Sequence, residues 1–384
     1  MKKSAIPTIK DIKDLKGKRV VLRLDFNVPI KNGKIIETMR IDRAMPTVEY
    51  LARKKARVII LSHIGKDASS SLMPIVRYLN KTMNVGFVSD FRTEEARKVA
   101  DGLPEGGVVM FENLRLDDRE TENDSEFSKY LSSFGDIYVN DAFAVSHRAH
   151  ASVVGITKYL PSYIGLLVAD EIKNLSLALK PKHPFLFILG GAKFETKMPL
   201  MKKFMKIADH VFVGGVLAKD FFHDEGIEVG KSFVDTYSFK LTPLLKKGKI
   251  ILPTDVVVKN GNGNKTPVKD INELSSVDRI VDVGPETIKN LAPIIKTAKL
   301  IVWNGPLGYY EEGFDKGTIA LLKAISESRA TSIIGGGDTA AVVEKLGLNK
   351  KLSFVSTGGG ATLDYLVDGR LIGIDAIIKC KKRK

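Results

Sequence analysis

The chain has 384 residues, which is too long for one ordinary hydrophobic core and suits two domains. Its composition, 44% apolar and 27% charged, is typical of a soluble globular protein. No apolar run reaches the roughly 18 residues of a membrane span. Because Cys380 is the single cysteine, the chain cannot form an internal disulfide. The formal charge of +15 is compatible with nucleic acid, an anionic membrane surface or small anionic substrates, but the lysines are spread along the chain and the basic tail at 379–384 is short. We therefore expect a cytoplasmic protein with no specific nucleic-acid partner and no membrane partner.

In the first half of the chain, short apolar runs alternate with longer helical patterns. The apolar runs predict strands at 19–26, 56–64, 107–114 and 136–143. The helical spacing predicts helices at 45–55, 73–83 and 125–135. Because uniformly apolar strands that alternate with helices are buried on both faces, this half predicts a parallel sheet covered by helices on both sides.

The second half repeats the alternation. It predicts strands at 185–191, 210–215, 250–258, 299–305, 331–337 and 352–360. It predicts helices at 197–208, 318–328 and 338–347. Residues 163–180 predict one helix between the halves, ended by Pro181 and Pro184. Ligands of parallel α/β sheets bind beyond the carboxyl ends of the strands, where this chain carries polar residues and glycines.

Arginine and glycine are distributed unevenly between the halves. Arginine occurs 12 times before residue 181 and 4 times after it, whereas glycine occurs 10 times before and 23 times after. The pattern indicates a first half that binds anions through side chains and a second half that binds them through the backbone.

Four segments of the second half share one pattern: an apolar strand, glycines, then a helix. They are 188–197, 211–219, 333–341 and 356–364. Glycine turns of this kind let a phosphate approach the backbone at a helix N-terminus. None matches a Walker A loop or a dinucleotide fingerprint. The run GNGNKT at 261–266 has no helix after it, and we interpret it as a hairpin turn.

Several side chains near these turns have two interpretations. Lys193 and Lys197 are four residues apart and either hold an anion between them or are solvated. Asp338 either caps a helix or holds Mg²⁺, and Thr339 would then bind a phosphate. Glu311 either accepts hydrogen bonds from a ribose or is an ordinary surface acid. Trp303 is assigned to packing.

In the first half, polar residues follow four predicted strands. Period-two alternation predicts that Asp25 and Asn27 point to one face. The other polar groups are Arg40, His63, Lys66, Asn113, Arg115, His147, Arg148 and His150. Arginines with neutral hydrogen-bonding groups favour a pocket for a small, doubly acidic molecule. Since no cysteine lies near His147 and His150, a metal site there is disfavoured.

The chain resembles the phosphoglycerate kinase family over essentially its whole length. The matching stretches, in the family's order, are VLRLDFNVP, RIDRAMPTVEYL, ILSHIGK, ENLR, YVNDAFAVSHRAHAS, ILGGAKFETK, LPTDVVV, VDVGPETI, VWNGPLGYYE, GGGDTAA and STGGGATLD. The resemblance implies two doubly wound, Rossmann-like parallel-sheet α/β domains joined by a hinge helix. It implies a phosphoglycerate-binding domain at 1–162 plus 365–384, a helix at 163–180 and a nucleotide-binding domain at 181–364.

The resemblance also implies reversible transfer of a phosphoryl group between 1,3-bisphosphoglycerate with MgADP and 3-phosphoglycerate with MgATP. It implies phosphoglycerate binding by Asp25, Asn27, Arg40, His63, Lys66, Arg115 and Arg148. It implies nucleotide binding by Gly191, Lys193, Lys197, Gly214, Gly215, Asn304, Pro306, Glu311, Gly335, Gly336, Gly337, Asp338 and Thr339, with Mg²⁺ on Asp338. Arg40, Lys193, Gly336 and Gly359 would stabilise the transferring phosphoryl group.

The chain departs from the family at a few positions. Lys66 stands where members usually have arginine, Val216 stands where a third glycine is usual, and the loop after Lys66 is short. A weakened paralogue that binds nucleotide or nucleic acid, and a kinase for another carboxylic acid, remain alternatives. With no heptad pattern, we expect a monomer.

Overall fold

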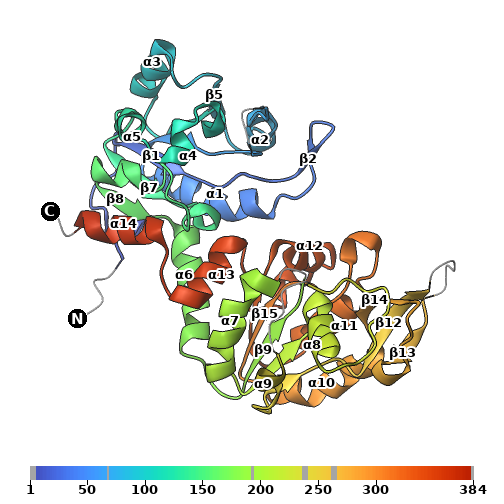
Figure 1. The fold of residues 1–384 in the computed structure, drawn as a ribbon. Coiled ribbons are helices and arrows are strands. Elements are labelled where there is room, and N and C mark those ends of the chain that lie inside the picture. The colour runs from blue at the N-terminus through green and yellow to red at the C-terminus, as the bar shows by residue number, and fades with distance from the viewer. Residues whose placement is uncertain (1–5, 67–68, 192–193, 236–240, 261–265, 382–384) are drawn as a thin grey trace. The chain divides into compact units, whose positions relative to one another are not determined.

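The computed structural model describes residues 6–66, 69–191, 194–235, 241–260 and 266–381 (Figure 1). The chain divides into two compact units, Met1–Lys173 with Arg370–Lys384, and Asn174–Gly369. The binding roles expected for the two domains stay predictions. No described helix is long and apolar enough to cross a membrane.

The first unit contains a six-stranded, wholly parallel sheet in the order β5-β6-β4-β1-β7-β8. Its strands are β1 (Arg19–Arg23), β4 (Arg57–Leu61), β5 (Val85–Val88), β6 (Val108–Phe111), β7 (Ile137–Asn140) and β8 (Ser162–Ile164). Its helices include α1 (Met39–Arg53), α2 (Met73–Leu79), α3 (Glu94–Gly102), α4 (Arg119–Glu122), α5 (Ser125–Ser132) and the C-terminal α14 (Ile372–Lys381). A small hairpin, β2 (Ile30–Lys31) with β3 (Lys34–Ile35), follows β1.

Both faces of this sheet are buried, as the apolar strands predicted. In β1, Val20 and Leu22 lie in one hydrophobic core, and Val21 lies in another. Helices α1 and α2 contribute to the first core, and α3 and α5 contribute to the second. Strand β1 lies in the middle of the sheet because the chain first adds strands on one side and then returns to add β7 and β8 on the other.

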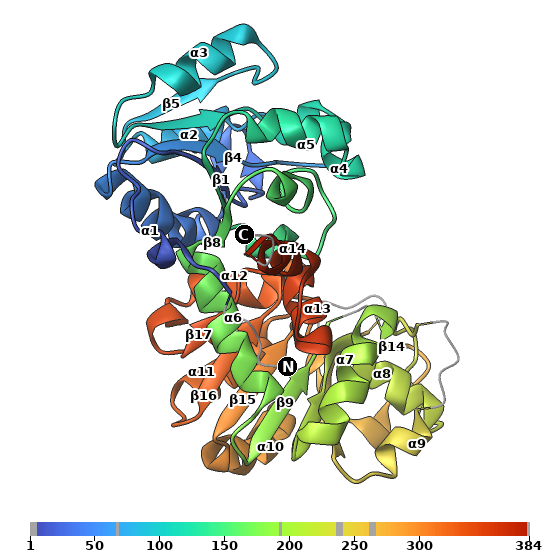
Figure 2. The same ribbon diagram turned by 90° about the vertical axis from the view of Figure 1, so that its left-hand side faces the viewer.

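The second unit also contains a six-stranded parallel sheet, with a different strand order, β11-β10-β9-β15-β16-β17. Figure 2 shows its strands β9, β15, β16 and β17 in succession. Its strands are β9 (Phe185–Leu189), β10 (His210–Val213), β11 (Ile250–Ile251), β15 (Leu300–Asn304), β16 (Thr331–Gly335) and β17 (Phe354–Val355). Its helices are α7 (Phe194–Ile207), α8 (Gly215–Asp224), α9 (Thr242–Leu245), α10 (Pro285–Thr297), α11 (Lys316–Ser326), α12 (Gly337–Lys345) and α13 (Gly360–Asp368). The strand order reverses between β9 and β15, and such a switch point is where doubly wound folds bind ligands.

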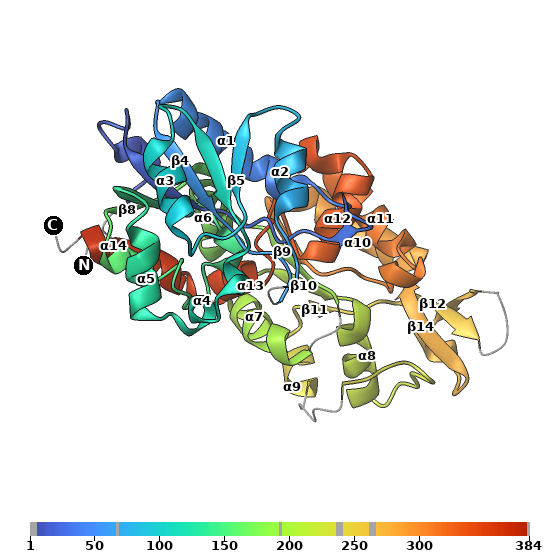
Figure 3. The same cartoon turned by 90° about the horizontal axis from the view of Figure 1, so that it is seen from above.

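Several expectations about elements were wrong in detail. The predicted strand 250–258 is two strands, because Pro253 interrupts it and lacks a backbone donor for a ladder. Its second part, β12 (Asp255–Asn260), pairs antiparallel with β13 (Val268–Asp270) and β14 (Asp278–Val283) in a separate sheet (Figure 3). The helix expected at 163–180 is α6 (Leu166–Leu179), preceded by edge strand β8. Strand β17 is also shorter than the predicted 352–360.

The predicted hairpin turn at 261–266 lies almost wholly outside the described residues. The strands on either side of it, β12 and β13, do pair antiparallel.

Candidate functional site

Arg40 connects the two polar residues that follow β1 in the first unit. Its Nη1 donates to Oδ2 of Asp25 at 3.2 Å and to the carbonyl oxygen of Asn27 at 3.0 Å. Asp25 is buried, whereas the Arg40 side chain is 30% exposed and accessible to a ligand. The alternation argument for Asp25 and Asn27 was wrong, because β1 ends at Arg23. Asp25 and Asn27 are instead connected by their hydrogen bonds to Arg40 of α1.

His63 follows β4 and is the centre of the charged cluster. Its Nδ1 lies 3.3 Å from Nη2 of Arg23, which can only donate, so Nδ1 accepts and the proton is assigned to Nε2. Burial, followed by the charge of Arg23, lowers the pKa of His63 to about 3. The charges of Arg115 and Arg148 also lower this pKa. The neutral imidazole can therefore donate through Nε2–H to an anion among arginines.

The other predicted residues of this cluster are less buried. Nη1 of Arg115 donates to the carbonyl oxygen of Lys66 at 2.6 Å. Oδ1 of Asn27 accepts from the backbone N–H of Gly65 at 3.0 Å. Lys66 and Arg148 are exposed. The structure thus joins Arg40 to Asp25 and Asn27, and Arg115 to the backbone of Lys66. That these residues bind a doubly acidic molecule stays a prediction.

Sequence reasoning missed a buried ion pair beneath this cluster. Nη2 of Arg23 lies 3.9 Å from Oε1 of Glu120, and both side chains are at most 1% exposed. Ser152 Oγ donates to Glu120 at 2.5 Å and accepts from Nε of Arg23 at 2.8 Å. Burial raises the pKa of Glu120. The signal was an arginine at the end of an otherwise apolar strand, which requires a buried partner.

His150 belongs to the same network. Its Nδ1 lies 3.8 Å from Oε1 of Glu120, and burial lowers the pKa of His150 to about 4. Among the described residues, no group of three or more histidine, cysteine or acidic side chains could hold a metal ion. The histidine spacing therefore has a structural explanation.

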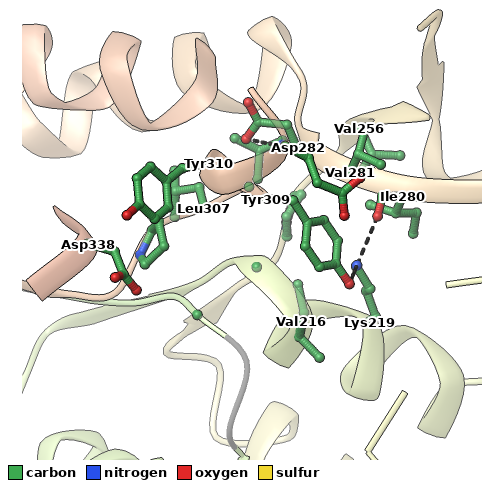
Figure 4. Close-up of a pocket in the computed structure, with 18 of the residues that line it drawn as sticks. Val216, Lys219, Val256, Ile280, Val281, Asp282, Leu307, Tyr309, Tyr310 and Asp338 are labelled. Carbon is green, nitrogen blue, oxygen red and sulfur yellow. Dashed lines mark hydrogen bonds between the residues drawn. The ribbon is translucent and has the colours of Figure 1, made fainter. Parts of the chain in front are cut away.

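The second unit contains a cavity of about 280 Å³ at the carboxyl ends of its parallel strands (Figure 4). The predicted nucleotide-binding residues that line it are Gly191, Gly215, Pro306, Glu311 and Asp338. They come from the segments after β9, β10, β15 and β16. Apolar walls are formed by Val216, Ala218, Phe222, Val256, Ile280, Val281 and Leu307. One wall of the cavity thus follows the switch point between β9 and β15.

Two glycines allow these strand ends to approach one another. Gly215 has φ +65°, and a Cβ there would lie 2.7 Å from the backbone nitrogen of Gly191. Gly305 has φ +88°, and a Cβ there would lie 2.5 Å from the carbonyl oxygen of Gly190. Any larger residue would push the backbone segments apart and open the floor of the cavity.

Lys197 lies in the first two turns of α7 and is buried. Its Nζ donates to the carbonyl oxygen of Gly190. Burial lowers the pKa of Lys197 to about 8, and the charge of Asp338 opposes that effect. Lys193, the other lysine of the predicted pair, lies outside the described residues.

Asp338 is in the first turn of α12, where Gly336 is the N-cap and no side chain caps the helix. The capping interpretation of Asp338 was therefore wrong. The Asp338 carboxylate is exposed and lines the cavity. The hydroxyl of Thr339, by contrast, is buried without a hydrogen-bond partner among the described residues.

The remaining predicted nucleotide residues do not line the cavity, namely Lys197, Gly214, Asn304, Gly335, Gly336, Gly337 and Thr339. Asn304 and Trp303 are buried at the end of β15, and the Trp303 indole donates to the carbonyl oxygen of Gly305 at 2.7 Å. Packing was therefore the right interpretation of Trp303.

Sequence reasoning also missed Lys219, which lines the cavity from α8 and is 2% exposed. Burial, followed by the charge of Arg279, lowers the pKa of Lys219 to about 7. The available signal was a lysine within the buried run 216–222.

The chain has two doubly wound α/β units. One carries an arginine cluster, and the other has a cavity lined by glycines at strand ends. This combination defines a class of two-domain proteins that bind anions and nucleotides. A sequence model described as phosphoglycerate kinase matches residues 9–369. The phosphoglycerate kinase of Borrelia garinii subsp. bavariensis is 40% identical, over 98% of this chain and 100% of its own length. That of Dictyoglomus turgidum is also 40% identical, over 97% of this chain and 98% of its own.

Solved structures agree with this relationship. Phosphoglycerate kinase from Coxiella burnetii matches with a TM-score of 0.85 and 37% identity, covering 98% of this chain and 99% of that one. The enzyme from Pyrococcus horikoshii matches with a TM-score of 0.87 and 30% identity, covering 99% and 100%. The chain belongs to the phosphoglycerate kinase family. Its activity is therefore the family's: phosphoryl transfer in glycolysis between a nucleotide and phosphoglycerate. The comparisons give no support to the two alternative functions.

Proposed function

We propose that the cavity of the second unit binds the nucleotide and that the cluster around His63 binds 3-phosphoglycerate or 1,3-bisphosphoglycerate. One observation carries the nucleotide assignment: residues from four strand ends, predicted separately, line one cavity beside the switch point. The phosphates would lie toward the glycine turns and Lys197, and Glu311 would accept hydrogen bonds from the ribose.

For the phosphoglycerate, the cluster offers positive charge and neutral donors. Arg40, Arg115 and Arg148 would bind carboxylate and phosphate oxygens, since guanidinium groups bind both with paired hydrogen bonds. Neutral His63 would donate from Nε2. Asp25 would orient Arg40 through the 3.2 Å contact rather than touch the anion itself. Lys66 would add a charge but no paired hydrogen bonds.

The nucleotide would be bound as its Mg²⁺ complex. Mg²⁺ usually takes one or two protein carboxylates together with substrate phosphates. Asp338 fits this requirement, because its exposed carboxylate lines the cavity and has no hydrogen-bond partner among the described residues. When bound, the ion would neutralise charge on the phosphates.

The transfer itself needs no general base. A carboxylate acceptor is already ionised near neutral pH, so catalysis rests on positioning and on charge stabilisation of a metaphosphate-like transition state. Arg40 and Lys193 would carry the charge of the moving phosphoryl group, helped by backbone N–H groups at Gly336 and Gly359. Closure of the two domains would exclude water as a competing acceptor. We further propose that the protein acts as a cytoplasmic monomer.

The direct test measures ADP release from MgATP with and without 3-phosphoglycerate, in the wild type, Lys193→Ala and the control Lys202→Ala. Lys202 is an exposed lysine of α7, outside the cavity. We expect turnover that depends on 3-phosphoglycerate, is lost in Lys193→Ala and persists in Lys202→Ala. Turnover with acetate but not with 3-phosphoglycerate would contradict the proposed acceptor. Turnover in the absence of added Mg²⁺ and with excess chelator would contradict the metal assignment.

A further inference from the structure

One end of the nucleotide cavity is formed by a buried lysine and a tyrosine. Nζ of Lys219 donates to the carbonyl oxygen of Ile280 at 2.9 Å and to the hydroxyl oxygen of Tyr309 at 3.2 Å (Figure 4). The same Nζ lies 4.5 Å from the centroid of the Tyr309 ring. All three residues line the cavity. A buried lysine is costly, and none of the roles proposed above for the nucleotide site uses Lys219.

Two acidic residues that line the cavity near this end, Asp282 and Glu312, already accept hydrogen bonds. Glu312 and Arg279 form an ion pair with two hydrogen bonds. Nη2 and Nη1 of Arg279 lie 2.7 Å and 3.0 Å from the two carboxylate oxygens of Glu312. The carboxylate oxygens of Asp282 accept from the backbone N–H groups of Val283 and Gly317 at 2.9 Å and 2.8 Å. Both carboxylates therefore already accept hydrogen bonds from donors of the protein.

Donors, in contrast, remain at this end. Below its pKa of about 7, Lys219 is an ammonium group with three N–H donors, of which the contacts above use two. The Tyr309 hydroxyl oxygen accepts from Lys219, which leaves its own hydrogen to donate. Arg279, which is paired with Glu312, packs against the same tyrosine, with its guanidinium carbon 4.7 Å from the centroid of the Tyr309 ring. The polar end of the cavity therefore suits a hydrogen-bond acceptor on the ligand.

The rest of the cavity is apolar. Val216, Ala218, Phe222 and Leu307 contribute walls that offer a flat ring only hydrophobic contact. A nucleobase in this cavity would consequently be distinguished mainly by the groups that it presents to Lys219 and Tyr309.

Purine bases differ at this kind of contact. Guanine presents two acceptors, O6 and N7, along one edge, and a lysine that donates to both is a common specific contact. Adenine has an amino group at C6, and its hydrogens would meet the donors of Lys219 and Tyr309. Hypoxanthine shares O6 and N7 with guanine but lacks the 2-amino group.

We propose that Lys219 and Tyr309 bind the oxygen at C6 of a purine base, so that this cavity prefers 6-oxopurine nucleotides, such as GDP and IDP, over ADP. The inference rests on the proposed function, because it takes the cavity to be the nucleotide site. Lys219 and Tyr309 are specificity-determining residues in this account, and the phosphate chemistry is left to the residues around Asp338.

Calorimetric titration of the full chain with ADP, GDP and IDP, each with Mg²⁺, tests the proposal. For the wild type we expect GDP and IDP to bind about tenfold or more tightly than ADP. In Lys219→Met, which keeps a long side chain without donors, the ratio of the ADP dissociation constant to the GDP or IDP dissociation constant falls towards one. In Lys219→Arg, which keeps donors, a preference remains. Lys247→Met, an exposed lysine outside the cavity, keeps the wild-type ratio.

Equal affinity of the wild type for IDP and ADP would overturn the proposal, and so would a preference that Lys219→Met leaves intact. If Lys219→Met does not fold, as judged by circular dichroism, Tyr309→Phe gives the second measurement, with an expected partial loss of the ratio. Turnover with 3-phosphoglycerate separates this inference from the proposed function. No turnover with any nucleotide contradicts the function, whereas turnover without a 6-oxopurine preference contradicts only the inference.

Discussion

Nη2 of Arg23 lies 3.3 Å from Nδ1 of His63, and both side chains are buried. Burial, together with the Arg23 donor that points at Nδ1, keeps the His63 imidazole in its neutral form. These effects make His63 a neutral donor in the cluster that we propose to bind phosphoglycerate, and they also make the free energy of unfolding depend on pH.

We predict that His63 lowers the stability of the protein in acid. Its pKa is about 3 in the folded state, against 6.5 in the reference state, so between these values only the unfolded chain is protonated. The stability of the folded protein is therefore unaffected by His63 above pH 6.5, and it decreases as the pH falls from 6.5 towards the folded-state pKa of about 3. Between about pH 7.5 and about pH 5, His63 alone would lower the free energy of unfolding by up to about 2 kcal/mol.

Urea unfolding at both pH values measures this effect. We expect the loss of stability to be smaller in His63→Gln than in the wild type, and equal to the wild type in His223→Gln, whose histidine is exposed. His150 acts in the same direction, because its pKa is also lowered. An unchanged loss in His63→Gln would show that His63 is protonated in the folded state.

Arg40 should matter far more to catalysis than other arginines of the same helix. We expect Arg40→Ala to lower kcat/KM by about 10²–10³, because a preorganised positive charge at the transferring group is removed. Arg53→Ala is the matched control, since Arg53 is exposed on α1 and, among the described residues, donates to a backbone carbonyl of its own helix. Steady-state kinetics with varied 3-phosphoglycerate compare the two, and similar values would refute the role of Arg40.

Lys197 should make nucleotide affinity depend on pH in the alkaline range. Its pKa is lowered to about 8, so the ammonium that would bind phosphate loses its proton above that pH. We expect affinity for MgADP to decrease between about pH 7 and about pH 9 in the wild type. In Lys197→Arg the guanidinium stays charged, and the decrease should disappear. Parallel pH profiles for both proteins would contradict this assignment.

The ion pair between Arg23 and Glu120 should be costly to break from one side. Arg23→Met leaves Glu120 buried without its partner, and we expect a loss of about 3–5 kcal/mol in the free energy of unfolding, less if Glu120 takes up a proton. Arg23→Met with Glu120→Gln should lose less than the sum of the two single variants. Arg92→Met, which breaks an exposed pair with Asp90, should cost about 0–1 kcal/mol. Additive losses would show that Arg23 and Glu120 are not coupled.

Much of the fold followed from local patterns in the sequence. Uniformly apolar strands alternating with helices predicted parallel sheets, because each strand is buried on both faces whatever its neighbours are. Glycines after β9, β10 and β16 predicted close backbone approach for the same local reason. The prediction failed where one apolar run, 250–258, serves two sheets, since periodicity does not say which partner a strand pairs with.

The sequence by itself therefore determined the class of fold, the strand ends that carry glycines and polar groups, and the family. Only the tertiary structure decided which of those groups meet. It buried Thr339 and exposed Asp338, although they are adjacent in the chain. In the tertiary structure Arg23 forms an ion pair with Glu120, and Lys219 donates a hydrogen bond to Tyr309 in the cavity wall. The physical reason is that the desolvation of a charged side chain is set by residues distant in sequence, which local spacing does not record.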